Sequence, residues 1–193
     1  MPATPDHRPL KDDRRTLRTK RSLAEALKQL ILEKGYEDVT VQDIIDKADV
    51  GRSTFYAHYE SKDQLLVGNI NFQQAFIDPP SGNEVYPMGI NLTYLFDHTK
   101  EHLSLVRRLS GTRGMVALTD FFTELCAARI MEHHKVGRPR SKTARSLFRY
   151  KAEAAAGGIV RMLSKWLEDG AVIPVEEMVT CATRILTIVN YPG

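Results

Sequence analysis

Residues 51–59 read Gly51-Arg52-Ser53-Thr54-Phe55-Tyr56-Ala57-His58-Tyr59, and this stretch decides the fold. Phe55 and Tyr59 stand four positions apart, which places both aromatic rings on one side of a short helix. The leading end of the same stretch is polar and includes Arg52. We therefore expect a brief helix over residues 52–58 that packs by its aromatic side and exposes a polar edge.

The residues before this stretch predict two further helices. The first spans residues 16–34 and ends at Gly35, in the position expected of a glycine that terminates a helix. Its apolar side chains repeat with helical spacing at Leu23, Leu27, Leu30 and Ile31. The second spans residues 41–48, with Thr40 as its N-cap and Asp43 three residues further on.

A connection of only two residues, Asp49 and Val50, joins the second helix to the third. A turn this tight often needs a left-handed backbone, which Asp tolerates better than most residues other than glycine. Three short helices joined in this way predict a helix-turn-helix, a motif that places its last helix in the DNA major groove.

The rest of the chain also has a helical pattern. Ser61 caps a helix predicted over 62–76, and prolines and glycines interrupt the pattern between residues 78 and 89. Further helices are predicted over 90–108, 113–135, 142–169 and 175–190, and no strand alternation is convincing. We expect an all-α fold with a disordered arm (1–14), a helix-turn-helix DNA-binding domain (15–62) and a helical effector-binding and dimerisation domain (63–193).

Composition narrows the class of protein. Hydrophobic residues make up 42% of the 193 residues, enough for a buried core, and no apolar run is long enough to span a membrane. Cys126 and Cys181 lie far apart in apolar helical patterns, which favours reduced thiols over a disulfide framework. We expect a cytoplasmic protein with no cofactor and no membrane partner. The formal net charge is only +3, so binding to DNA must depend on where individual charges lie.

The polar edge of the third helix is the candidate DNA-reading surface. Arg52 can make a bidentate contact to guanine, with Ser53 and Thr54 beside it at the leading end of the helix. Tyr56 and His58 follow at positions suited to phosphate contacts. The predicted phosphate contacts at helix N-termini are Lys62 and Thr40, because free amides and the helix dipole both favour an anion there.

These residues together resemble the TetR/AcrR family of transcription regulators. The resemblance runs from about Arg18 to Leu66 through Lys34-Gly35-Tyr36, Thr40-Val41-Gln42-Asp43-Ile44, Ala48 to Tyr56, His58-Tyr59 and Ser61-Lys62-Asp63-Gln64-Leu65-Leu66. Family members usually carry Gly where this chain has Asp49, and often Ser where it has Gly51. Residues 150–160 and 166–170 are similar to a C-terminal subtype that includes the dihydroxyacetone kinase operon activator.

The resemblance implies a homodimer that binds a palindromic double-stranded DNA operator and responds to a small-molecule effector. Repression is the expected outcome, with activation by the same fold as the alternative. The predicted dimer interface uses the apolar sides of the last two helices: Ile159, Met162, Leu163, Trp166, Met178, Ala182, Ile185 and Val189. The predicted effector pocket is lined by aromatic and polar residues of the middle helices: Tyr94, Phe96, Arg113, Met115, Phe121, Phe122 and Tyr150.

Other classes of function remain open at this point. His98, Glu101 and His102 have the spacing of an inverted zinc-protease motif, so a metal-binding protein or metalloenzyme is one alternative, with ligands from 132–134 completing the site. Residues 136–140 resemble the core of a minor-groove AT-hook, although a solvated loop explains the same composition. A dimeric interaction module that has lost DNA binding is the third alternative, and the intact polar edge at Arg52 argues against it.

Overall fold

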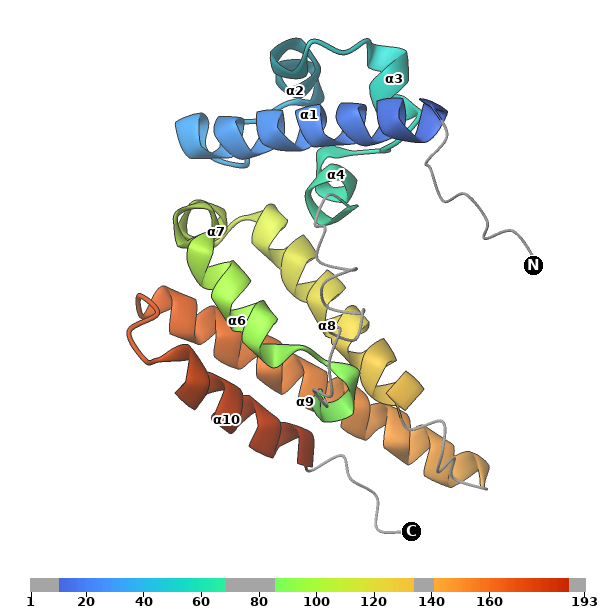
Figure 1. Cartoon of the computed structure of the whole chain (residues 1–193), viewed down its shortest axis with the longest axis vertical. Helices are drawn as coiled ribbons and strands as arrows, with labels where there is room; N and C mark the ends of the chain where they lie inside the picture. The colour runs from blue at the N-terminus through green and yellow to red at the C-terminus, as the bar shows by residue number, and fades with distance from the viewer. Residues whose placement is uncertain (1–10, 69–85, 134–140, 188–193) are drawn as a thin grey trace, which may run out of the picture. The chain divides into compact units, whose positions relative to one another are not determined.

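The computed structural model describes residues 11–68, 86–133 and 141–187, and these ranges contain helices and no strand. The all-α prediction is confirmed. The helices are α1 (Lys11–Lys34), α2 (Val41–Ala48), α3 (Arg52–Tyr56), α4 (Lys62–Gly68), the short 3₁₀ helix η1 (Pro87–Gly89), α6 (Leu92–Glu101), α7 (Leu103–Leu109), α8 (Arg113–His133), α9 (Lys142–Glu168) and α10 (Val175–Thr187) (Figure 1). None of them is long and apolar enough to cross a membrane.

The chain divides into two compact units, residues 1–69 and 70–193. The boundary falls after α4, later than the predicted boundary at residue 62, because α4 packs on α1 and buries Leu65 completely. Residues 11–14 are helical and belong to α1, whereas we expected them in the polar arm. The predicted helix over 90–108 is interrupted at His102, which has a non-helical backbone and separates α6 from α7.

The first unit is held together by the apolar stripe of α1. Leu23, Leu27 and Ile31 are buried, and Phe55 and Ile44 from the following helices are buried in the same unit. Gly35 ends α1 with φ +84°, and its amide donates to the carbonyl of Ile31 at 2.9 Å. This left-handed turn directs Tyr36 into the core, as a glycine immediately after a helix allows.

The second unit has α9 as its longest helix, with α8 and α10 packed against it (Figure 1). Trp166 of α9 lies edge-on against Phe96 of α6, with ring centroids 5.4 Å apart. Its indole Nε1 donates to the carbonyl of Ile173 at 3.0 Å and so fixes the turn from α9 to α10. One core therefore joins α6, α8, α9 and α10.

The predicted dimer interface needs correction, because most of its side chains are already covered within one chain. The residues buried in the core of the second unit are Ile159, Leu163, Trp166, Met178 and Ala182. These residues keep 7% or less of their surface exposed, so they have little area left for a partner. Met162 and Ile185 remain partly exposed, and Val189 lies outside the described residues.

Candidate functional site

The turn between α2 and α3 sets the position of the candidate recognition helix. Asp49 has φ 52° and ψ 51°, the left-handed conformation that the sequence predicted. Its amide donates to the carbonyl of Asp46, and the amide of Val50 donates to Ile45 at 3.1 Å. These bonds satisfy the last carbonyls of α2 while the chain reverses, so only three residues separate α2 from α3.

Helix α3 is anchored by its aromatic side. Phe55 is fully buried, Tyr59 is nearly so, and their ring centroids are 6.0 Å apart. On the opposite side Arg52 and Ser53 are exposed, and 48% of Tyr56 is accessible. The guanidinium of Arg52 lies 5.8 Å from the centroid of the Tyr56 ring, which shows that these two residues share one face. The α3 edge, defined here as Arg52, Ser53, Thr54 and Tyr56, is therefore an exposed polar surface on a buried anchor.

Thr40 forms a complete capping box at the start of α2. Its hydroxyl accepts from the amide of Asp43 at 3.1 Å, and its own amide donates to the Asp43 carboxylate at 2.7 Å. The Lys34 ammonium contacts the same carboxylate at 2.8 Å, and these bonds hold the pKa of Asp43 far below its usual range. Asp43 therefore stays ionised and fixes the N-terminus of α2 on the end of α1.

Lys62 is placed differently from the predicted phosphate contact. Its ammonium donates to the carbonyls of Tyr36, Glu37 and Val39 at 2.7, 3.2 and 2.7 Å, and it lies 4.4 Å from the centroid of the Tyr36 ring. An ammonium has three N–H donors, so all of them are used within the protein. We correct the side-chain assignment: Lys62 ties α4 to the loop after α1.

A basic surface near the start of α1 was not among the predicted DNA contacts. Arg14, Arg15, Arg18 and Arg21 are all exposed. Three of them recur at i, i+4 and i+7 along one helix face. The signal was present in the sequence as a cluster of basic residues, but the helix was expected to start too late to place Arg14 and Arg15 on it.

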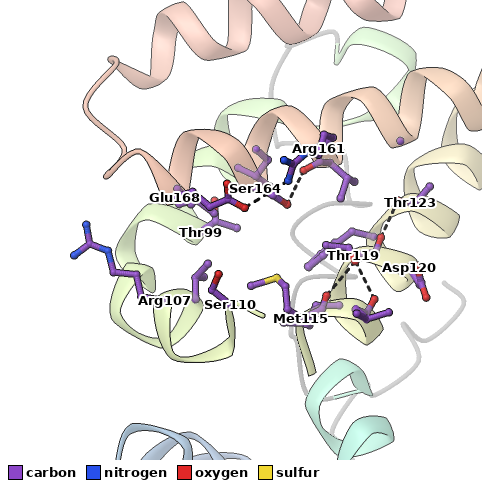
Figure 2. Close-up of a pocket in the computed structure, with 18 residues that line it drawn as sticks. Thr99, Arg107, Ser110, Met115, Thr119, Asp120, Thr123, Arg161, Ser164 and Glu168 are labelled. Carbon is purple, nitrogen blue, oxygen red and sulfur yellow. Dashed lines mark hydrogen bonds and ion pairs between the residues drawn. The ribbon is translucent and has the colours of Figure 1, made fainter. Parts of the chain in front are cut away.

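The second unit contains a cavity of about 670 Å³ (Figure 2). It lies among α6, α7, α8 and α9, and its apolar lining includes Val106, Met115, Phe122 and Leu163. Of the residues predicted for an effector pocket, Met115 and Phe122 line this cavity. The other five do not line it and are corrected: Tyr94, Phe96, Arg113, Phe121 and Tyr150. Phe96 is fully buried in the core, whereas 58% of Tyr150 is exposed, so these two side chains lie on opposite sides of the solvent boundary.

Within the described residues, His98 of α6 and His102 after it gain no third ligand, and the predicted His134 lies outside those residues. The rings of His98 and His102 meet edge to face, with centroids 4.6 Å apart, and the Tyr94 ring stacks on His98. Burial and the neighbouring His102 lower the pKa of His98. Across the part of the chain that the structure describes, no three His, Cys, Asp or Glu side chains are grouped so as to hold a metal ion. Nothing in the structure favours the metalloenzyme alternative.

Comparison with known proteins identifies a family match within the first unit. Residues 23–68 match the family model "Bacterial regulatory proteins, tetR family". A TetR transcriptional regulator from Streptococcus agalactiae 2603V is 26% identical, with a TM-score of 0.55 over 93% of this chain and 98% of the other. This segment, residues 23–68, has the sequence of the tetR family. The matched segment contains α2, α3 and α4 with the second half of α1.

Curated relatives match only a short part of this chain. An uncharacterized HTH-type transcriptional regulator of Bacillus subtilis, YxbF, is 42% identical over 55 residues, which are 28% of this chain and 14% of the relative. The transposon Tn10 TetC protein of Escherichia coli is 38% identical over 60 residues, 31% of this chain and 30% of the relative. The matches thus span less than a third of each relative's own length.

The fold of the whole chain also resembles the dihydroxyacetone kinase operon activator DhaS. That structure covers 88% of this chain, and 94% of its own chain is matched, with a TM-score of 0.57 and 17% identity. At this identity the likeness concerns the fold alone.

Proposed function

We propose that this protein is a DNA-binding transcription regulator that acts as a homodimer on a partly palindromic operator. The observation that carries the proposal is the α3 edge: a five-residue helix whose buried Phe55 supports an exposed row of polar side chains. This is the arrangement that a major-groove reading helix needs. Repression is the proposed outcome, because a protein bound over an operator excludes other proteins from the same DNA.

Each residue of the α3 edge has a proposed role. Arg52 reads guanine, since its exposed guanidinium is not held in an ion pair within the described residues. Ser53 and Thr54 contact neighbouring bases, and Tyr56 donates to a phosphate beside them. The remaining phosphate contacts that we propose are His58, the amides at the start of α2 beside Thr40, and the exposed arginines of α1.

We place the dimer contact on the outer sides of α9 and α10. Cγ2 of Ile185 lies 3.7 Å from where a Cβ atom on Gly158 would stand, so the two helices meet there. Residues one helical turn away on each helix share this face. The dimer face is therefore defined as Ala154, Gly158, Met162, Cys181 and Ile185, all of them exposed or half-exposed in one chain.

The effector-responsive part of the proposal rests on the cavity of the second unit. Its volume of about 670 Å³ falls in the range of small-molecule pockets. In this proposal, an effector that binds one arrangement of the dimer better than another shifts the population between them and so changes operator affinity.

The test of the proposal starts from DNA fragments selected from a genomic library by the purified protein. Arg52→Ala is then compared with wild type on a selected fragment and on a scrambled one. Loss of a bidentate base contact should weaken specific binding by about 1–3 kcal/mol and leave binding to the scrambled fragment nearly unchanged. Arg145→Ala, an exposed arginine of α9, is the matched control. An unchanged footprint and affinity in Arg52→Ala, or the absence of any enriched fragment, contradicts the proposal.

A further inference from the structure

The charged side chains around the cavity of the second unit lie at its rim. The Arg161 guanidinium is 3.4 Å from the Glu168 carboxylate, whose other oxygen is 3.8 Å from the Lys165 ammonium. Figure 2 shows the side chains of Arg107 and Asp120 pointing away from the middle of the cavity. The Arg107 guanidinium instead lies beside Gly170, after the end of α9. Of the two arginines that line the cavity, Arg161 is thus paired with Glu168 and Arg107 points outward, so neither is aimed at an anion in the middle of the cavity (Figure 2).

Five hydroxyls line the cavity; that of Ser110 belongs to an exposed residue, and the other four have already donated their protons. Each donates to the carbonyl four residues earlier in its own helix: Thr99 at 2.8 Å, Thr119 at 3.0 Å, Thr123 at 2.7 Å and Ser164 at 2.9 Å. A hydroxyl has one proton and two lone pairs, so each of these groups turns only acceptor capacity toward the cavity. Thr119 and Ser164 approach the cavity from α8 and α9, respectively (Figure 2).

Around these acceptors the lining is apolar. Val106, Met115 and Phe122 come from α7 and α8, while Val160, Leu163 and Leu167 come from α9. A carboxylate or phosphate placed among them loses its hydration and finds acceptors rather than donors, which is costly. An uncharged group with an O–H or N–H keeps its hydrogen bond and buries its apolar part at the same time.

We propose that this cavity binds uncharged, largely apolar molecules that donate a hydrogen bond, such as alkylphenols and long-chain alcohols, and rejects anions. The assignment names the ligand class of the effector site and so rests on the proposed function. Thr119 and Ser164 are the specificity-determining acceptors, one on each of the two longest helices that line the cavity.

Three probes with the same apolar body test the ligand class on the full-length protein. They are 4-octylphenol, its methyl ether, which has no donor, and 4-octylbenzoate, which is an anion. Binding is followed by isothermal titration and by the emission of Trp166, the single tryptophan of the chain, which lies beside Leu167. The phenol should bind roughly 3- to 10-fold more tightly than the ether, as one hydrogen bond implies, and the benzoate should bind most weakly. Equal affinities, or tighter binding of the benzoate, overturn the proposal.

Two substitutions locate the acceptors. Thr119→Val and Ser164→Ala should each lower phenol affinity about 3- to 10-fold while leaving ether affinity unchanged. Thr180→Val is the matched control, because Thr180 also donates to the carbonyl four residues earlier, at 2.9 Å, but lies on α10 away from the cavity. If all three variants bind the phenol like wild type, the acceptor assignment is wrong.

Ligand binding and operator binding are measured separately, so the two proposals can fail separately. Selective phenol binding without any effect on DNA affinity supports the ligand class and contradicts the effector role. Loss of operator affinity on addition of 4-octylbenzoate but not of the phenol supports effector control and overturns the ligand class.

Discussion

The role that the sequence predicts for Lys62 differs from the role that the structure shows. A lysine at the start of a helix beside a recognition motif indicates a phosphate contact. The structure gives its ammonium three carbonyl acceptors from the loop after α1, and Asp63 accepts from the Tyr36 hydroxyl. The beginning of α4 thus secures the end of α1, a contact between residues 26 positions apart that no local pattern reveals.

Replacing this lysine should therefore affect stability more than DNA binding. Lys62→Met keeps the length of the side chain but removes the charge-assisted hydrogen bonds, and should lower the free energy of unfolding by about 1.5–3 kcal/mol. Chemical denaturation followed by circular dichroism measures this loss. Lys47→Met is the control, because the 2.6 Å Lys47–Glu33 pair is a surface ion pair worth about 1 kcal/mol or less.

DNA binding by the same variants tests whether Lys62 also contacts a phosphate. With no phosphate contact from the Lys62 side chain, the salt dependence of operator binding should be the same in Lys62→Met and wild type. A decrease of about one in the slope of log affinity against log salt would restore the original phosphate assignment.

At the scale of whole helices, the features that the sequence predicted correctly are local ones. Gly35 and Thr40 mark the end of α1 and the start of α2 because a positive φ and a side-chain cap depend on a few neighbouring residues. The apolar sides of α9 and α10 were also recognised. The sequence did not show which residues cover these apolar sides. Periodicity indicates that Trp166 packs on an apolar surface, but not whether that surface belongs to its own chain or to a partner.

Most of the residues that line the cavity were missed for a related reason. A pocket forms where helices diverge, and that depends on packing between segments far apart in sequence. Aromatic residues such as Phe96 were predicted to contact the ligand, whereas Phe96 packs on Trp166 in the core. Thr119 and Ser164 gave no signal, because a hydroxyl bonded to its own helix is common anywhere on a helix surface.

The turn between α2 and α3 allows a test at this scale. Because Asp49 has a left-handed backbone, residues at this position should rank by their tolerance of positive φ. Asp49→Gly should be at least as stable as wild type, and Asp49→Val should lose about 1–2 kcal/mol. Hydrogen exchange in peptides covering residues 41–59 reads the local stability of this segment. Equal protection in the glycine and valine variants would contradict the left-handed turn.

At the scale of the whole molecule, the proposed reading of an operator requires two copies of α3, one for each half-site. The second unit buries the strongest apolar residues of α9 and α10 within itself, so the dimer must use what remains outside. The dimer face has small or partly covered side chains at Ala154, Gly158 and Cys181. Small residues allow helices from two subunits to approach closely, as in a four-helix bundle.

A bulky charge on this face should separate the subunits without disturbing the core. Ala154→Arg and Cys181→Arg both change exposed positions, so each chain should fold normally while analytical ultracentrifugation shows monomers in place of dimers. Ala128→Arg changes an exposed alanine of α8 and should leave the dimer intact. Both dimer-face variants should also lose most of their affinity for a two-half-site operator, because two half-sites are then bound independently. Dimers that persist in both variants would place the contact elsewhere, while a wild-type monomer that binds the operator with full affinity would contradict the dimeric mechanism itself.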